Sequence, residues 1–476
     1  MGREPVTKWQ VGAHRFATRR VDVALVHGDP TMRHDPLRAS SRATAVGAVV
    51  AVLVLAGCAI LAFLRPAPTI GDADIVRDDD TGAIYVVLDG VLHPTSGLAS
   101  ARLIVGRPDD PVGVPTERIA ERPRGAAVGI VDAPHSIAVR TDATVWSVCD
   151  RGATSSEAGA TTVGVTSDPT DPKTPGPNTP GPRQSGGAVL WQRDGITYLL
   201  HDGVRSRLDP ADTVLMRALG LDDAQPVRVS AALLDSVPES RPLEVPRIDG
   251  VGTPVAYALG NRRVGSVVTV DLGDRSRHYV ALADGIQAVG SAVAQVLRFS
   301  DSAGRVGLDA IAPDVIARAP RTERPLDVSA FPEAPPQLAA VGNVCAAWSS
   351  PAAGPVVVTT GDDVPAGRPD AVVQPGADGG GDAVDRVDID AGAGVFVIAT
   401  DPLVAETRRD GRFYVSDTGV RYGVPTDDDA SALGLGEPVP VPWSMIARLP
   451  AGPTLDADAA RRTHDGPPLE AASPGR

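Results

Sequence analysis

The sequence predicts an α+β protein with a single N-terminal transmembrane helix and a large extracytoplasmic body. Three observations predict this organisation: one long apolar run near the N-terminus, a basic excess on only one side of that run, and a tyrosine-centred strand pattern that recurs four times. Strand patterns alternate with short helical stretches throughout the body, which is typical of small mixed domains.

The apolar run extends from Ala43 to Leu64, 22 residues between two arginines. A helix of this length spans about 33 Å, which is enough to cross a bilayer. The letters Leu-Ala-Gly-Cys at 55–58 also have the form of a lipoprotein signal, which would be cut before Cys58. We favour a retained anchor, because 42 residues precede the run and six apolar residues follow Cys58, whereas a secretory signal has a short basic start and about 7–15 apolar residues.

The charges on either side of the run predict its orientation. Residues 1–42 hold eight Lys or Arg against four acids, a net +4, so the formal charge of −14 leaves −18 for the rest of the chain. Basic flanks stay in the cytoplasm, so we expect a single-pass protein of the inner (plasma) membrane with its N-terminus inside and the bulk of the chain on the periplasmic side. A body this acidic argues against nucleic acid as a partner.

The segment before the span contains a predicted amphipathic helix. At 100° per residue, Trp9, Phe16 and Val23 fall on one face, with Arg15 and Arg19 beside it. A basic amphipathic helix next to a membrane can lie on anionic lipid or dock on a partner protein. We favour docking, because the Asp-Pro pairs in 29–36 would fix a bend before the span.

Four of the six tyrosines, Tyr85, Tyr198, Tyr279 and Tyr414, have similar surroundings. Each is followed by an apolar residue, then by a glycine five or six positions on, and then by a short helical pattern. One unit is therefore a β-hairpin plus a helix. The second and fourth copies share an Arg-Asp-Gly before the tyrosine and an Ala-Leu-Gly-Leu after it.

The cysteines follow the same duplication. Cys149 lies 64 residues after the first tyrosine of the series and Cys345 lies 66 after the third, and each has a tryptophan three positions away. We interpret the body as two related halves, each with an odd repeat, a core segment with its cysteine, and an even repeat. An even pair of cysteines in an oxidising compartment indicates a disulfide, and two free buried thiols are the alternative.

These patterns set the expected domain boundaries. They are a cytoplasmic amphipathic segment 1–42, a transmembrane helix 43–64, repeat domain 1 at 72–125, the first central half at 126–192 with a disordered loop at 166–187, repeat domain 2 at 193–250, repeat domain 3 at 255–325, the second central half at 326–404, repeat domain 4 at 405–455, and a flexible tail 456–476.

The sequence shows no motif for catalysis, cofactor binding or metal binding. A phosphate-binding loop needs a lysine after its glycines, and the only lysines, Lys8 and Lys173, have no such glycines before them. The eight histidines are scattered, without zinc-site spacing, and no G-x-S-x-G is present. We therefore expect no catalytic residue, no metal and no cofactor.

The stretch from Gln10 to Pro66, "QVGAHRFATRRVDVALVHGDPTMRHDPLRASSRATAVGAVVAVLVLAGCAILAFLRP", closely resembles the N-terminus of the EccB family of the type VII (ESX) secretion system. The resemblance continues through "GDADIVRDDDTGAIYVVLDGVLHPTSGLASARLIVG" and "VWSVCD" and covers nearly the whole chain.

This resemblance implies a fold and a role. The implied body has a β-rich central domain and four small repeat domains, related by a quasi-two-fold axis and locked by one disulfide, with Cys149 and Cys345 at the family's cysteine positions. The implied role is structural: a core subunit that self-associates, joins EccC, EccD and EccE, and supports export of WXG100-type proteins. ATPase activity is attributed to the family, so ATP hydrolysis is the alternative, and whether the chain is an enzyme stays open.

Overall fold

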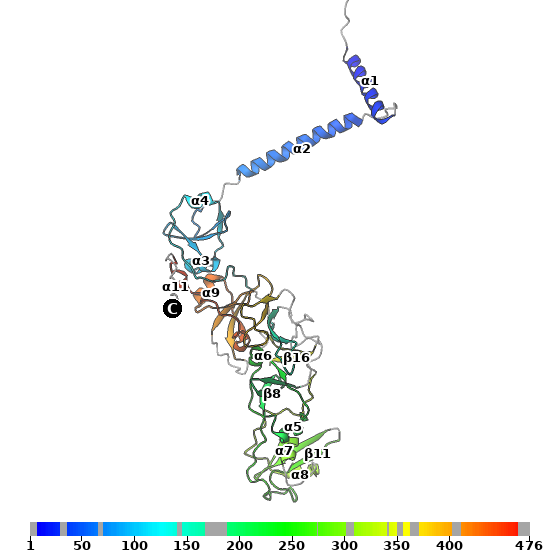
Figure 1. The fold of residues 1–476 in the computed structure, drawn as a ribbon, viewed down its shortest axis with the longest axis vertical. Helices are drawn as coiled ribbons and strands as arrows, with labels where there is room; N and C mark the ends of the chain where they lie inside the picture. Colours follow the sequence, from blue (N-terminus) through cyan, green and yellow to red (C-terminus); the bar gives the residue numbers. More distant parts are fainter. Residues whose placement is uncertain are drawn as a thin grey trace, which may run out of the picture. The chain divides into compact units, whose positions relative to one another are not determined.

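The computed structural model describes residues 7–28, 36–64, 70–139, 145–166, 188–273, 275–300, 309–339, 342–349, 356–361, 371–401 and 411–464 (Figure 1). They belong to two compact units, Met1–Thr69 and Ile70–Arg476. The predicted bend at 29–35 and almost all of the predicted disordered loop, 167–187, lie outside the described residues.

The described residues of the first unit form two helices. Helix α1 (Lys8–His27) begins after Thr7, whose backbone N–H donates to Gln10 Oε1, and ends at Gly28, which takes a left-handed φ of 69°. Helix α2 (Pro36–Leu64) includes Arg42–Ile60, a stretch long and apolar enough to cross a membrane. This confirms the prediction of an N-terminal apolar helix, and α2 continues past Cys58 without a break.

The second unit contains four small sheets with one topology. In each, the first strand lies between the second strand, which is antiparallel to it, and the fourth strand, which is parallel to it; the third strand pairs with the second. A helix connects the third and fourth strands, and a second helix follows the fourth strand. We call these units repeats 1 to 4.

The repeats consist of the following elements. Repeat 1 has β1 (Ile75–Asp78), β2 (Ile84–Leu88), β3 (Val91–Thr95), α3 (Leu98–Val105), β4 (Val112–Val114) and α4 (Thr116–Ala120). Repeat 2 has β7 (Val189–Arg193), β8 (Ile196–His201), β9 (Val204–Leu208), α5 (Thr213–Leu219), β10 (Val227–Arg228) and α6 (Ala231–Ser236). Repeat 3 has β11 (Val267–Asp271), β12 (Ser276–Ala281), β13 (Ile286–Val289), α7 (Ser291–Ser300), β14 (Asp309–Ala310) and α8 (Pro313–Arg318). Repeat 4 has β19 (Val395–Thr400), β20 (Arg412–Val415), β21 (Arg421–Gly423), α9 (Asp427–Leu433), β22 (Val439–Pro442) and α10 (Trp443–Ile446).

The predicted hairpins form where the Asp-Gly pairs occur. In repeats 1 and 2, the aspartates and glycines of 89–90 and 202–203 all have positive φ between 49° and 79°. Two residues with positive φ make a type I′ turn, whose twist matches that of the flanking strands. These turns join β2 to β3 and β8 to β9.

Two predicted boundaries are wrong by one strand. Strands β7 and β19 pair with the tyrosine strands β8 and β20, so the sheets of repeats 2 and 4 begin at 189 and 395, not at 193 and 405. Both strands begin with consecutive apolar, buried residues, Val189–Trp191 in β7 and Val395–Val397 in β19, so they lack the period-2 alternation of a half-buried strand. The sequences of β7 and β19 therefore favoured assigning these strands to the central domain.

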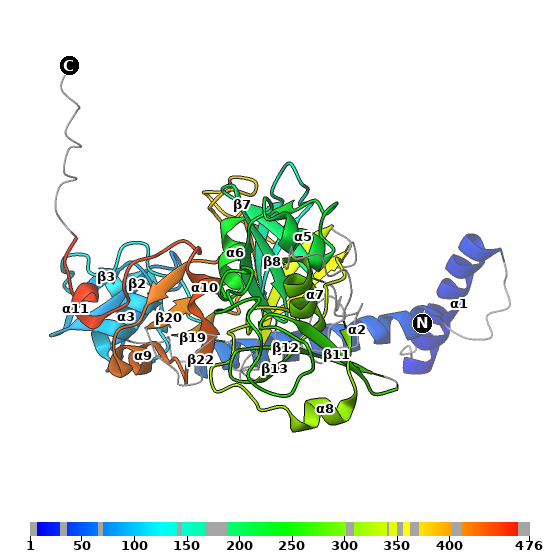
Figure 2. The ribbon, with the colours of Figure 1, turned by 90° about the horizontal axis from the view of Figure 1, so that it is seen from below.

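The central domain is a six-stranded sheet that joins the two halves of the body. Its order is β16 (Val357–Gly361), β15 (Asn343–Ser349), β5 (Val145–Arg151), β6 (Ala160–Thr166), β18 (Arg386–Asp388) and β17 (Val372–Val373). The hairpins β5–β6 and β15–β16 meet through the antiparallel pair β5–β15. A local two-fold axis between β5 and β15 relates the hairpin β5–β6 to the hairpin β15–β16. Helices α6 and α10, equivalent elements of repeats 2 and 4, lie side by side (Figure 2). Both also contact β5.

The repeats also contact one another in pairs. Helix α3 of repeat 1 packs on α9 of repeat 4, and α5 of repeat 2 packs on α7 of repeat 3 (Figure 1). Continuous apolar cores cross both contacts. Because the sequence pattern makes repeats 1 and 3 equivalent, and likewise 2 and 4, these two contacts are also equivalent.

The expectation of a flexible tail from 456 is wrong for residues 456–464. Asp456 caps helix α11 (Ala457–Ala460), accepting from the Ala459 N–H at 2.7 Å, and α11 packs on α3. Ala460 is fully buried. The segment is rich in alanine and aspartate, so its apolar surface is small and its composition resembles that of a tail. Residues 465–476 lie outside the described residues.

Candidate functional site

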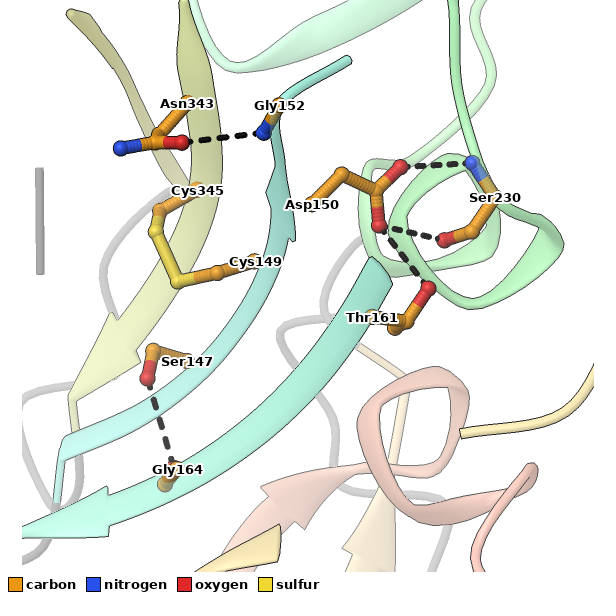
Figure 3. Close-up of a disulfide and its surroundings, with 9 residues drawn as sticks. All are labelled: Ser147, Cys149, Asp150, Gly152, Thr161, Gly164, Ser230, Asn343 and Cys345. Carbon is orange, nitrogen blue, oxygen red and sulfur yellow. Dashed lines mark hydrogen bonds between the residues drawn. A yellow bond between two sulfur atoms is a disulfide. The ribbon is translucent and has the colours of Figure 1, made fainter. Parts of the chain in front are cut away.

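The disulfide lies at the centre of the body. Cys149 on β5 and Cys345 on β15 are directly opposite each other in the antiparallel register, with Cα atoms 4.1 Å apart, and their sulfurs are bonded (Figure 3). This separation is close to that of a non-hydrogen-bonded pair, in which side chains approach most closely. The predicted disulfide is confirmed, and it joins strands 196 residues apart.

The two tryptophans near the cysteines also pair across these strands. Trp146 lies opposite Trp348, and alternation along the strands places both on the other face of the sheet from the cysteines. Both indoles are buried in the largest apolar core of the body, together with residues of α6 and α10. The disulfide on one face and this core on the other fix the contact between the two halves.

The four repeat tyrosines each lie on the second strand of their sheet, in separate repeats. Tyr198, Tyr279 and Tyr414 are buried and Tyr85 is half-buried. The Tyr414 hydroxyl donates to the Ala138 carbonyl at 3.1 Å, and burial raises the pKa of Tyr414 to about 12. The structure therefore places these side chains in the packing of each repeat and does not bring them together as a site.

The predicted docking face lies on α1. Trp9 is 89% exposed and Phe16 50% exposed, while Val23 is half-buried. Arg15 and Arg19 are exposed on the same helix. Trp9 and Phe16 therefore offer large apolar side chains to solvent within this unit.

Sequence reasoning missed a buried carboxylate beside the disulfide. Asp150 follows Cys149 on β5 and points to the opposite face of the sheet (Figure 3). Its Oδ2 accepts from the Ser230 N–H at 2.6 Å, and its Oδ1 accepts from the Ser230 hydroxyl at 2.7 Å and from the Thr161 hydroxyl at 3.0 Å. Ser230 is the N-cap of α6, so this carboxylate ties the central sheet to repeat 2.

A second buried carboxylate extends this network. Asp385 accepts from the Thr161 N–H at 2.7 Å and from the N–H groups of Asp378 and Gly379 at 2.8 and 2.7 Å. The glycine loop that it holds fits tightly: Gly380 has φ 107°, and a Cβ there would lie 2.6 Å from the Ala158 carbonyl oxygen. Thr161 thus links both carboxylates through its hydroxyl and its N–H.

Ion pairs join repeats 2 and 4 nearby. Arg448, just after α10, donates to Asp235 of α6 at 2.8 and 3.1 Å. Arg193 of β7 pairs with Asp382, and Arg448 also donates to the Asp382 carbonyl at 3.3 Å. Arg193 and Arg448 thus meet at one residue of the glycine-loop region.

An open cleft of about 650 Å³ lies next to this network. The loop 156–158, the β7–β8 turn, Arg228 and the glycine loop 379–381 line it. Among the ranges that the structure describes, no three His, Cys, Asp or Glu side chains gather as metal ligands would. Its charged lining residues are two arginines, Arg193 and Arg228, and two acids, Glu157 and Asp194.

Replacing Thr161 with valine is expected to lower the free energy of unfolding by about 1–2 kcal/mol, because the buried Asp150 loses one hydrogen-bond donor. Thr197→Val is the matched control: its buried hydroxyl has no hydrogen-bond partner among the described residues, so its removal is expected to be neutral or stabilising. Urea unfolding of both variants measures the difference. Equal losses in the two would contradict a structural role for the Thr161 hydroxyl.

Comparison with known proteins places the chain in one family. The sequence model described as "Type VII secretion system ESX-1, transport TM domain B" matches residues 3–469. The protein named ESX-3 secretion system ATPase EccB3 of Mycolicibacterium smegmatis is 36% identical over 484 aligned positions, covering 97% of this chain and 91% of that protein. The ESX-1 secretion system ATPase EccB1 of Mycobacterium tuberculosis H37Rv is 32% identical over 484 positions, covering 99% of this chain and 97% of that protein.

Solved structures agree with these relatives. A chain of the intact ESX-5 inner membrane complex matches with a TM-score of 0.70 and 28% identity over 100% of this chain and 99% of that chain. A chain of the EccB3 dimer from the ESX-3 core complex matches with a TM-score of 0.68 and 33% identity over 82% of this chain and 100% of that chain. From its sequence and its fold, this chain belongs to the EccB family of membrane core subunits of type VII (ESX) secretion systems.

Proposed function

We propose that this chain acts as a structural scaffold of the secretion core complex, without a cofactor of its own, and supports export of WXG100-type proteins across the inner membrane. The observation that carries the proposal is that the buried charged groups at the centre of the body hold elements together. Asp150 accepts from Ser230, the N-cap of α6, Asp385 holds the glycine loop, and Arg193 pairs with Asp382. Family membership supplies the secretion system.

The proposed topology puts α1 in the cytoplasm and the body on the periplasmic side. The basic excess of residues 1–42 supports this orientation. A disulfide supports it as well, because disulfides persist in oxidising compartments. We expect α1 to dock on EccC, EccD or EccE-like subunits, since Trp9 and Phe16 are exposed on one helix face.

Co-purification tests the docking face. Full-length protein extracted from membranes is expected to bring an EccC-like motor with it, and the variant Trp9→Ala/Phe16→Ala is expected to recover at least about tenfold less, because truncation of aromatic anchors at an interface costs more than about 2 kcal/mol. Thr18→Ala, on the opposite face of α1, is the control. Equal recovery with all three proteins would refute docking through this face.

An ATPase assay tests the scaffold itself, since the named relatives carry ATPase in their names. Full-length protein is expected to show no turnover above that of a matched preparation lacking the protein. The decisive variant is Arg228→Ala, in the cleft beside the glycine loop. Turnover that exceeds this background and falls with Arg228→Ala would replace the scaffold with an ATP-hydrolysing subunit.

A further inference from the structure

The two equivalent contacts between repeats differ in how the chain connects them. Repeat 2 runs directly into repeat 3, so a continuous segment holds their contact together. Repeat 4 ends the fold and repeat 1 begins it, so no direct chain connection joins them. In place of a connection, the segment 455–464 leaves repeat 4 and lies against repeat 1.

This segment, which we call the clasp, bonds to both repeats. At its start, the Ala457 N–H donates to Asp429 of α9 in repeat 4 at 3.0 Å. At its end, Arg461 donates to the Ile104 carbonyl of α3 in repeat 1 at 3.1 Å. Leu455, the first residue of the clasp, and Ala460 are fully buried in the core that α3 and α9 share. One short segment therefore bonds to both repeats and to the core that they share.

Backbone pairing continues beyond α11. Thr463 forms an antiparallel bridge with Val128, the His464 N–H donates to the Ala127 carbonyl at 2.9 Å, and the Gly129 N–H donates to the Arg462 carbonyl at 3.3 Å. The clasp thus adds a short strand to the segment that follows repeat 1.

The segment after repeat 2 makes the equivalent contacts. Arg241 pairs with Asp327, which follows repeat 3, and Ile248 packs against the apolar cluster of repeat 3 that Leu326 and Val328 also cover. There the contacting segment continues into repeat 3 as one chain, so the segment stays attached to repeat 3 if the two repeats separate.

We propose that the contact between repeats 1 and 4 is a non-covalent latch, closed by the clasp, and that it opens as a local unit while the rest of the body stays folded. Local openings of a native protein have free energies between near zero and that of global unfolding, and they involve contiguous cooperative units that often coincide with supersecondary motifs. Without the clasp, α3 and α9 keep their own packing and the bond from Arg102 to the Leu433 carbonyl at 3.2 Å, and the bond from the Tyr414 hydroxyl to the Ala138 carbonyl still joins repeat 4 to the segment after repeat 1. Repeat 1 follows the membrane helix in sequence, so the latch would set how firmly the anchored repeat is coupled to the body. The latch does not depend on the proposed function, and the experiments that test the two are independent.

Hydrogen exchange on the full chain in detergent tests the latch. Deletion of 456–476 is expected to speed exchange of α3 and α9 amides by about tenfold or more, and to leave β5, β15, α5 and α7 within a factor of about two. Deletion of 465–476 alone is the control and should change none of these rates. Ala460→Asp, which puts a charge into the buried contact, should act like the longer deletion, and the exposed Asp458→Ala should not.

A disulfide that holds the clasp closed tests the latch by strengthening the contact. Val128→Cys with Thr463→Cys places two thiols at bridge partners, and their disulfide is expected to slow α3 and α9 exchange by about tenfold relative to either single variant. Unchanged exchange in the longer deletion would overturn the latch. So would faster exchange throughout the body, because the clasp would then belong to the global fold.

Discussion

Protein with both Cys149→Ala and Cys345→Ala is expected to unfold with a free energy about 5 kcal/mol lower than the native chain. The bond closes a loop of 196 residues, and the chain-entropy model, in which the bond constrains the unfolded chain, gives about that value for a loop of this length. The loop contains all of repeats 2 and 3. We therefore expect the contact between the two halves to be the part of the fold most affected.

Denaturant unfolding of the full-length protein in detergent measures this loss. Cys58→Ser is the matched control, because Cys58 is exposed on α2 and unpaired, and it should leave the transition unchanged. A thiol assay on denatured, unreduced protein should count one reactive thiol. Three thiols, or a double variant as stable as the native chain, would contradict a stabilising disulfide.

Much of the architecture could be predicted because its signals are local. The apolar run predicted α2, and the Asp-Gly turns at 89–90 and 202–203 predicted hairpins. The cysteine spacing relative to Tyr85 and Tyr279 predicted equivalent positions, and the structure places Cys149 and Cys345 opposite each other. Each of these signals can be recognised from residues close in the sequence or from the number of residues between two positions.

A further repeat signal was present in the sequence and was missed. In every repeat, the third strand has an N–H that donates to the carbonyl of a proline at 2.8–2.9 Å, and these prolines are Pro123, Pro238, Pro320 and Pro450. They follow the repeat tyrosines by 38, 40, 41 and 36 residues. The bonded segment covers what would otherwise be an open sheet edge. A proline signals a turn or an edge, but not which edge, so its role could only be recognised in the fold.

The Asp150 network and the clasp depend on contacts between residues far apart in the sequence, which a local sequence pattern cannot predict. Asp150 meets Ser230, 80 residues away, and Thr161 meets Asp385, 224 residues away. The letters around Asp150 indicate only a strand, and an aspartate at a strand end is usually solvated. Its burial follows from the packing of α6 on β5, which is a property of the assembled body.

Asp150→Ala is expected to lower the free energy of unfolding by about 3 kcal/mol or more, because three buried donors lose their acceptor together. Asp150→Asn is the informative companion. With its amide oxygen toward the Ser230 N–H, its NH2 group can donate to the Ser230 and Thr161 hydroxyls, so we expect a much smaller loss near pH 7. A loss as large for asparagine as for alanine would show that the network requires the charge.

The same pair of proteins tests how Asp150 titrates. Burial raises its pKa from 3.8 to about 6, against the hydrogen bonds from Ser230 and Thr161 and the charge of Arg193, which lower it. Because the folded state then holds the proton more tightly than the unfolded state, this group stabilises the fold as the pH falls from about 6 to about 4 and destabilises it above. A difference of about two pH units between the folded and unfolded pKa values corresponds to about 3 kcal/mol.

Urea unfolding at each pH measures this effect. The unfolding free energy of the native chain minus that of Asp150→Asn should rise by about this amount between pH 7 and pH 4. The subtraction cancels carboxylates such as Asp78 and Asp284, whose pKa values are lowered by hydrogen bonds from Thr81 and Thr322. A difference that stays constant with pH would mean that Asp150 remains ionised and that its hydrogen bonds outweigh its burial.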